Sequence, residues 1–159
     1  MLAGYGVVLT GAGSGMGAAA AQRFAREGAR VVVSDIDEAR ALDVARTIDP
    51  AGQRAIGLRC DVASAQDCAD LVAAAERFFG APIDAFLANA GVSFAGDFLT
   101  ADPAALRRVV DINVTGSIFS AQAALRSLGF VIAPADLGGL QMIASMAELF
   151  RPPGSAPRR

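Results

Sequence analysis

The chain has 159 residues, of which 53% are hydrophobic and few are aromatic, so it can form one domain with a core of small aliphatic side chains but not two. A net charge of −2 and a pI of about 5.0 give no reason to expect nucleic acid or an anionic membrane as a partner. No apolar run is long enough to span a membrane, so we expect a cytoplasmic protein. The chain contains no histidine and no lysine, and Tyr5 is its only tyrosine, which excludes a histidine base, a lysine Schiff base and a Walker phosphate loop.

Short apolar runs alternate with amphipathic stretches along the chain. This pattern predicts strands at about 5–10, 30–34, 54–60, 83–88 and 140–144. It predicts helices at about 15–27, 38–48, 65–79 and 102–128, the last of them bent near Gly116. Strands separated by helices of this length form a parallel sheet covered on both faces, so the predicted fold class is α/β with a doubly wound sheet of about five strands. We expect residues 1–150 to form this domain and residues 151–159 to form a loose tail rich in proline and arginine.

The first predicted strand runs into a glycine-rich turn, Thr10-Gly11-Ala12-Gly13-Ser14-Gly15-Met16-Gly17, and a helix begins within it. Glycine lets a pyrophosphate approach the backbone, and the free N–H groups of the first helical turn can bind it. The fingerprint G-x-G-x-x-G fits only in a weaker form that starts at Gly13 and ends at Ala18, whereas T-G-x-x-x-G-x-G fits fully. The turn predicts the start of a Rossmann-like nucleotide-binding fold, and the alternative is a glycine-rich turn without a ligand.

Polar residues follow the next strands at the same edge of the predicted sheet. Asp35 ends the second strand about 20 residues after the glycine turn, where a carboxylate can bind the adenosine ribose hydroxyls and repel a 2′-phosphate. Asp35 could instead cap the next helix, but Asp37 is the better cap and leaves Asp35 free. This arrangement favours NAD over NADP. Cys60 and Cys68 are too few for a disulfide framework and, without histidine, do not make a zinc site, so we expect both to be buried.

These features, taken in order, resemble the short-chain dehydrogenase/reductase family over residues from about 5 to 150. The resemblance implies that the NAD cofactor is bound by these residues: Thr10, Gly11, Ser14, Gly15, Met16, Gly17, Asp35, Asp61, Val62, Asn89, Ala90 and Gly91. Within this set, Asp61-Val62 would lie over the adenine and Asn89 would brace the central strands and the cofactor loop. Each of these short motifs alone is also typical of an ordinary turn.

The resemblance also implies two catalytic residues. Asn113, in the segment Asp111-Ile112-Asn113-Val114-Thr115-Gly116, would hold a water in a proton relay, and Ser145, after the fifth strand, would donate a hydrogen bond to the substrate carbonyl. A single asparagine within a helix is otherwise a tolerated polar residue, and a serine after a strand is a weak signal alone.

The resemblance ends after Ser145. In the family a tyrosine exchanges a proton with the substrate, and a lysine four residues later lowers the pKa of that tyrosine. Here the tyrosine position falls on Arg158, the lysine position lies beyond the last residue, and arginine stays protonated. We therefore expect a truncated or frame-shifted dehydrogenase that is catalytically incomplete, with apolar surface of the 102–128 helix exposed.

By this resemblance the predicted function is NAD-dependent hydride transfer to or from a small-molecule alcohol or ketone. Two alternatives remain open: a non-catalytic NAD-binding module and an inert fragment. The oligomeric state also stays open, because the helix through which family members associate is absent from this sequence.

Overall fold

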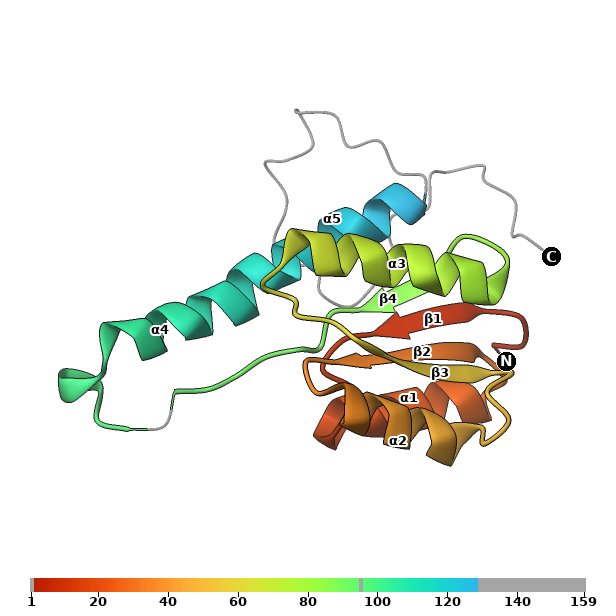
Figure 1. The fold of residues 1–159 in the computed structure, drawn as a ribbon, viewed down its shortest axis with the longest axis horizontal. Coiled ribbons are helices and arrows are strands. Elements are labelled where there is room, and N and C mark those ends of the chain that lie inside the picture. The colour runs from red at the N-terminus through yellow and green to blue at the C-terminus, as the bar shows by residue number, and fades with distance from the viewer. Residues whose placement is uncertain (1, 95, 129–159) are drawn as a thin grey trace.

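The computed structural model describes residues 2–94 and 96–128, in which parallel strands form a 4-stranded sheet in the order β3-β2-β1-β4 (Figure 1). The strands are β1 (Gly6–Leu9), β2 (Arg30–Asp35), β3 (Ala55–Arg59) and β4 (Ala85–Leu87). The helices are α1 (Gly15–Arg26), α2 (Glu38–Ile48), α3 (Ala65–Phe79), α4 (Pro103–Val110) and α5 (Gly116–Ser127), with short turns η1 (Phe98–Thr100) and η2 (Asp111–Thr115). This confirms the predicted Rossmann-like, doubly wound fold class. The fifth strand expected at 140–144, Ser145 and the tail at 151–159 lie outside the described residues.

Different helices cover the two faces of the sheet, as Figure 1 shows. Val7 and Leu9 of β1 pack in one cluster with buried alanines of α1 and α2, whereas Val8 packs with Leu71 and Val72 of α3 and with α5. Successive side chains of a strand point to opposite faces, so an unbroken valine-rich run is buried on both sides. The apolar runs of the sequence therefore place the sheet in the middle layer.

Side-chain caps fix where several helices begin. The backbone N–H of Arg40 donates to Asp37 before α2, and the backbone N–H of Asp67 donates to Ser64 before α3, as the sequence predicts. Ser14, which precedes α1, makes no such bond. The first N–H groups of α1 therefore lack a side-chain acceptor. This start of α1 lies at the cleft at the carboxyl ends of the strands.

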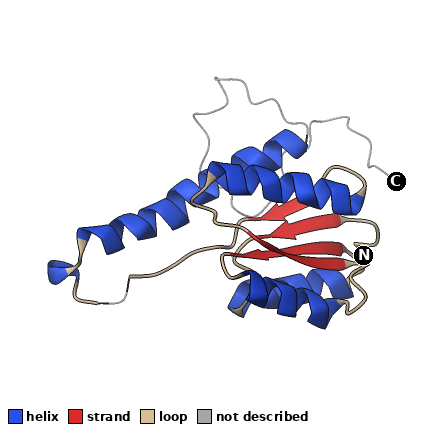
Figure 2. Cartoon of the chain, viewed as in Figure 1, coloured by secondary structure: helices blue, strands red, loops and turns tan. Residues whose placement is uncertain are grey.

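The helix expected at 102–128 is built from α4, η2 and α5 in succession, and it extends beyond the sheet (Figure 2). Its irregularity is a π-helical turn at Asp111–Thr115, directly before the bend expected near Gly116. Val110, Val114 and Ile118 are exposed and lie four residues apart, so they form an apolar stripe along one side of this helix. The expected exposure of apolar surface on this helix is therefore found.

Neither stretch of described residues, 2–94 or 96–128, contains a helix that is long and apolar enough to cross a membrane.

Arg30, the first residue of β2, ties the sheet to the end of α3. Its guanidinium donates to the carbonyl of Phe79 at 2.9 Å and to the carbonyl of Phe78, and it lies 4.3 Å from the centre of the Phe78 ring. Carbonyls in the last turn of a helix have no partner within the helix, so these bonds satisfy groups that would otherwise need water.

We expect Arg30→Ala to lower the free energy of unfolding by about 1–2 kcal/mol, because it removes two charge-assisted hydrogen bonds and a cation–π contact. Urea denaturation measures this change. Arg46→Ala is the matched control, because Arg46 forms an exposed ion pair of 3.8 Å with Asp43 and no other polar contact within residues 2–94 and 96–128. We expect a change below about 0.5 kcal/mol. Equal effects of the two substitutions would contradict the proposed link between β2 and α3.

Candidate functional site

A cleft of about 920 Å³ opens at the carboxyl ends of the strands. Its walls come from the segments after all four strands, from the start of α1, and from α4 with η2. The chain passes from β1 outward to β2 and β3 and then returns to β4 on the other side of β1, so β1 borders the point where the strand order reverses. Ligands of open α/β sheets bind at such a point. The lining includes these residues named from the sequence: Gly11, Ser14, Gly15, Met16, Gly17, Asp35, Asp61, Val62, Asn89, Ala90 and Gly91.

The turn before α1 forms the floor of the cleft. Gly15 has a φ of +56°, a conformation that a side chain would strain, and a Cβ built on it would meet no atom within 4 Å. The space beside its backbone is therefore open, and the N–H groups of the first turn of α1 have no side-chain cap. These features fit the phosphates of a dinucleotide, which bind to backbone N–H groups at a helix start.

Asn89 braces this turn from the end of β4. Its side-chain amide donates to the carbonyls of Thr10 and Gly11 at 3.1 and 3.0 Å, and the Thr10 hydroxyl accepts from the backbone N–H of Asn89 at 3.2 Å. Thr10 is buried and does not line the cleft, so its role is to position the turn. This is the brace that the family resemblance implies.

Asp35 lines the cleft, but its carboxylate is already engaged. One oxygen accepts from the backbone N–H of Gly13 at 3.0 Å, and the other accepts from the N–H of Asp37 at 3.1 Å. This differs from the expectation that the Asp37 cap leaves Asp35 free. Each carboxylate oxygen can accept more than one bond, so the group is held in place and still has capacity for a ligand hydroxyl.

A side chain of α3, Asp67, holds the Asp61-Val62 segment in place. The backbone N–H of Asp61 donates to Asp67 at 3.1 Å, and Arg59 donates to the same oxygen at 2.8 Å. The bond from the Asp61 N–H, followed by the Ser64 hydroxyl and Arg59, holds the pKa of Asp67 below its ordinary value, so this side chain stays charged at neutral pH.

Cys60 also lines the cleft, and both cysteines are buried and free, as expected. A hydrogen bond with the Cys68 thiol and then burial raise the pKa of Cys60 far above its ordinary value, so it stays a neutral thiol. Within the described ranges, no group of three or more His, Cys, Asp or Glu side chains is arranged to hold a metal ion.

Asn113 does not line the cleft but fixes the segment after β4 that does. Its side-chain oxygen accepts from the backbone N–H of Val92, and its amide nitrogen donates to the carbonyl of Val92, each at 2.8 Å. The hydroxyl of Ser117 donates to the backbone carbonyl of Asn113 at 2.7 Å. The side chain that the resemblance assigns to a water relay is therefore occupied with the backbone of Val92.

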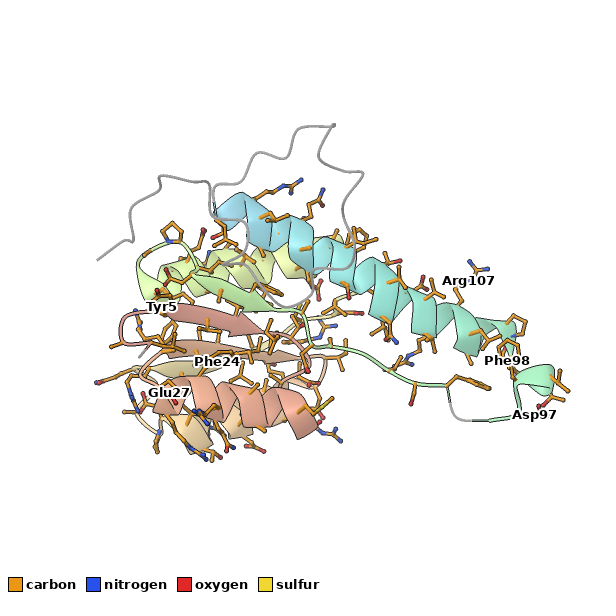
Figure 3. The ribbon with its side chains drawn as sticks, turned by 180° about the vertical axis from the view of Figure 1, so that it is seen from behind. Tyr5, Phe24, Glu27, Asp97, Phe98 and Arg107 are labelled. Atoms are coloured by element: carbon orange, nitrogen blue, oxygen red, sulfur yellow. The ribbon has the colours of Figure 1, made fainter. Side chains whose placement is uncertain are left out.

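The single tyrosine lies away from the cleft. Figure 3 shows Tyr5 with Phe24 and Glu27 at one end of the sheet and Arg107, which lines the cleft, far toward the other end. Tyr5 precedes β1, whose opposite end leads into the glycine turn. Tyr5 therefore cannot act at the cleft in this fold.

Several lining residues carry no motif that sequence reasoning could use. They are Ile36, Arg40, Arg107 and Arg108. Ile36 directly follows Asp35, which is the one signal available for it. The three arginines become neighbours of the cleft only through the way that α2 and α4 are placed against the ends of the strands. Asp111 and Ile112 also line the cleft, and the signal for them is that they directly precede Asn113 in the segment named from the sequence.

Comparison with known proteins places this geometry in context. The family model described as short chain dehydrogenase matches residues 6–156. A cis-4-hydroxycyclohexanecarboxylate dehydrogenase of Sinomonas cyclohexanicum is 43% identical over 122 residues, which are 76% of this chain and 48% of that protein. An L-rhamnose 1-dehydrogenase (NAD(P)(+)) of Azotobacter vinelandii is 37% identical over 144 residues, which are 84% of this chain and 56% of that protein.

Solved structures agree with these relatives. A 3-ketoacyl-(acyl-carrier-protein) reductase of Brucella melitensis, complexed with NADH, is similar with a TM-score of 0.74 and 34% identity, over 80% of this chain and 51% of that one. The chain thus spans about half the length of the proteins that it matches.

Proposed function

Because this chain belongs to the short-chain dehydrogenase family, we propose that it provides the nicotinamide-dinucleotide site of an oxidoreductase acting on an alcohol or carbonyl compound. The observation that carries the proposal is the uncapped start of α1 at the floor of a cleft that also contains Asp35. Residues 1–150 would be the NAD-binding part of this domain.

In this proposal each part of the cleft receives one part of the cofactor. The N–H groups of Ser14 to Gly17 bind the pyrophosphate, and the Asp35 carboxylate accepts hydrogen bonds from the adenosine ribose. Asp61 and Val62 bound the adenine side, and Ala90 and Gly91 also belong to the lining. When bound, the nicotinamide ring supplies or accepts the hydride.

The preferred cofactor in this proposal is NAD rather than NADP. Asp35 supports this preference, since a carboxylate at the end of β2 accepts from a ribose hydroxyl and repels a phosphate in the same place. The N–H groups of Gly13 and Asp37 fix the orientation of the Asp35 carboxylate, and Asp35 lines the cleft.

The catalytic part of the proposal rests on fewer residues. Asn113 positions Val92 beside the cleft, and Ser145 would donate a hydrogen bond to the substrate carbonyl. The sequence supplies neither a lysine nor a second tyrosine to exchange the proton. We therefore propose that these 159 residues alone bind the cofactor without turning over an alcohol or a ketone, and any turnover by them would contradict this.

A second candidate function is a non-catalytic NAD-binding module. It is favoured by the contrast between the cleft residues described above and the lack of a lysine or a second tyrosine among these 159 residues. Both candidates require a formed nucleotide pocket, whereas an inert fragment does not have one.

Titration of the chain with NADH tests the proposal, and we expect a saturable rise in nicotinamide fluorescence. Asp35→Ala should weaken NADH binding about 10- to 100-fold, because hydrogen bonds to a charged acceptor contribute about 1.5–3 kcal/mol. Asp43→Ala is the control, since Asp43 is an exposed residue of α2 outside the cleft lining, and it should leave the affinity unchanged. Absence of saturation with a folded chain would remove both candidates, and unchanged affinity in Asp35→Ala would remove the ribose role of Asp35.

A further inference from the structure

Met16 places an exposed thioether at the floor of the cleft. It lies between Gly15 and Gly17 in the first turn of α1, it lines the cleft, and it is 84% exposed. It belongs to neither of the two core clusters formed by the described residues, so packing of the core does not account for it. This apolar side chain is therefore within reach of whatever enters the cleft.

Its exposure sets Met16 apart from the other sulfur-bearing side chains that the structure describes. Cys60 and Cys68 are 3% and 0% exposed, and oxidation of a thiol requires access to it. A thioether has no proton to lose before it reacts, so an accessible methionine is oxidised without the help of a base. Among residues 2–94 and 96–128, Met16 is therefore the sulfur that a peroxide reaches first.

The oxidation consumes one molecule of hydrogen peroxide. A lone pair of the sulfur attacks one peroxide oxygen, so that an S–O bond forms and the O–O bond breaks. The departing hydroxide takes the proton of the transferred oxygen and leaves as water. The sulfur loses two electrons and the peroxide gains them, which converts methionine to methionine sulfoxide.

A sulfoxide at this position changes how the start of α1 receives an anion. The thioether is apolar, whereas the sulfoxide is polar and its oxygen accepts hydrogen bonds. Because no side chain of the described ranges caps this helix start, its first N–H groups are free for a phosphate. An acceptor oxygen on a side chain of the same turn competes for these N–H groups and repels the phosphate oxygens.

We propose that Met16 is an oxidation site through which peroxide lowers the dinucleotide affinity of the cleft, and that a bound dinucleotide shields this side chain. The inference rests on the proposed function, because it places the pyrophosphate at the N–H groups of Ser14 to Gly17. Methionine sulfoxide reductases reduce both epimers of the sulfoxide, so the change is reversible.

The test treats the 159-residue chain with hydrogen peroxide and then removes the peroxide. Peptide mass spectrometry measures the oxidation of Met16, and fluorescence titration measures the dissociation constant for NADH. We expect the sulfoxide to weaken NADH binding about five- to tenfold, and the two methionine sulfoxide reductases to restore the affinity. Saturating NAD during the treatment should slow the oxidation of Met16 by about tenfold, because little of the chain is then free.

Met16→Leu is the matched control, because leucine is also apolar and has no sulfur to oxidise. The affinity of this variant before treatment is its own reference, and peroxide should leave that value unchanged. Met1, Met142 and Met146 remain in the variant, so any effect of their oxidation is measured there.

The inference is overturned if Met16 resists peroxide, if its sulfoxide binds NADH as tightly as the untreated chain, or if NAD does not slow the oxidation. An equal loss of affinity in treated Met16→Leu would also overturn it. In each of these cases the untreated chain still binds NADH and the proposed function stands. If a folded, untreated chain does not bind NADH, the proposed function fails as well, which distinguishes the two failures.

Discussion

Replacing Gly17 with valine should abolish NADH binding and lower the free energy of unfolding by about 3 kcal/mol. A Cβ at Gly17 would lie 2.5 Å from the side-chain nitrogen of Asn89 and 2.5 Å from the carbonyl oxygen of Gly11. Real Cβ atoms do not approach so closely, so one of these groups would have to move. Asn89 cannot move freely, because its amide already bonds the carbonyls of Thr10 and Gly11. Valine would therefore separate the start of α1 from the end of β4.

Urea denaturation and NADH titration of the same preparations measure the two effects. Ala19→Val is the control on the exposed side of α1, and it should cost only about 0.5 kcal/mol through the lower helix propensity of valine. It should leave NADH binding unchanged. If Gly17→Val is as stable as Ala19→Val, the close contact between α1 and Asn89 does not exist as described.

Gly57→Val should have an effect of similar size on stability, although Gly57 belongs to no motif. A Cβ at Gly57 would lie 2.5 Å from the carbonyl carbon of Ala41 and 2.5 Å from the backbone nitrogen of Leu42. These are backbone atoms of α2, and they cannot rotate aside as a side chain can. Valine at this position would push α2 away from β3, and we expect a loss of about 3 kcal/mol in the free energy of unfolding.

The same substitution should weaken nucleotide binding, since α2 carries Arg40, which lines the cleft. Leu58→Val, one residue along β3, is the control and should cost about 1 kcal/mol through loss of one methylene. Denaturation of the two variants, followed by NADH titration, measures both effects. Equal stability of Gly57→Val and Leu58→Val would show that α2 does not rest on Gly57.

The sequence alone was sufficient for the fold class and for most of the cleft floor. Apolar runs separated by helical stretches predict a parallel sheet, and the caps Asp37 and Ser64 place the starts of α2 and α3 correctly. The glycine turn and the residues after each strand could be assigned to one edge, because the carboxyl ends of parallel strands meet there. These features depend on local pattern and on a rule of topology.

The tertiary structure decided which side chains meet. Local pattern left Asp35 free, whereas the fold brings the Gly13 N–H against it. Asn113 is 21 residues from Val92, and only the packing of the long helix against the end of β4 lets its side chain bind that backbone. The close approach of Arg40 to Gly13, and that of α2 to Gly57, also depend on how α2 packs against the sheet.

The physical reason is a difference in range. Periodicity, caps and turns act over a few neighbouring residues, so they can be read directly from the sequence. Contacts between residues distant in the chain depend on the exact positions of the helices on the sheet. Because the core is close-packed, shifts of a fraction of an ångström in these positions change which side chains touch. The sequence by itself therefore determined the fold class and the edge of the sheet at which the cleft lies, and only the tertiary structure decided which side chains line that cleft.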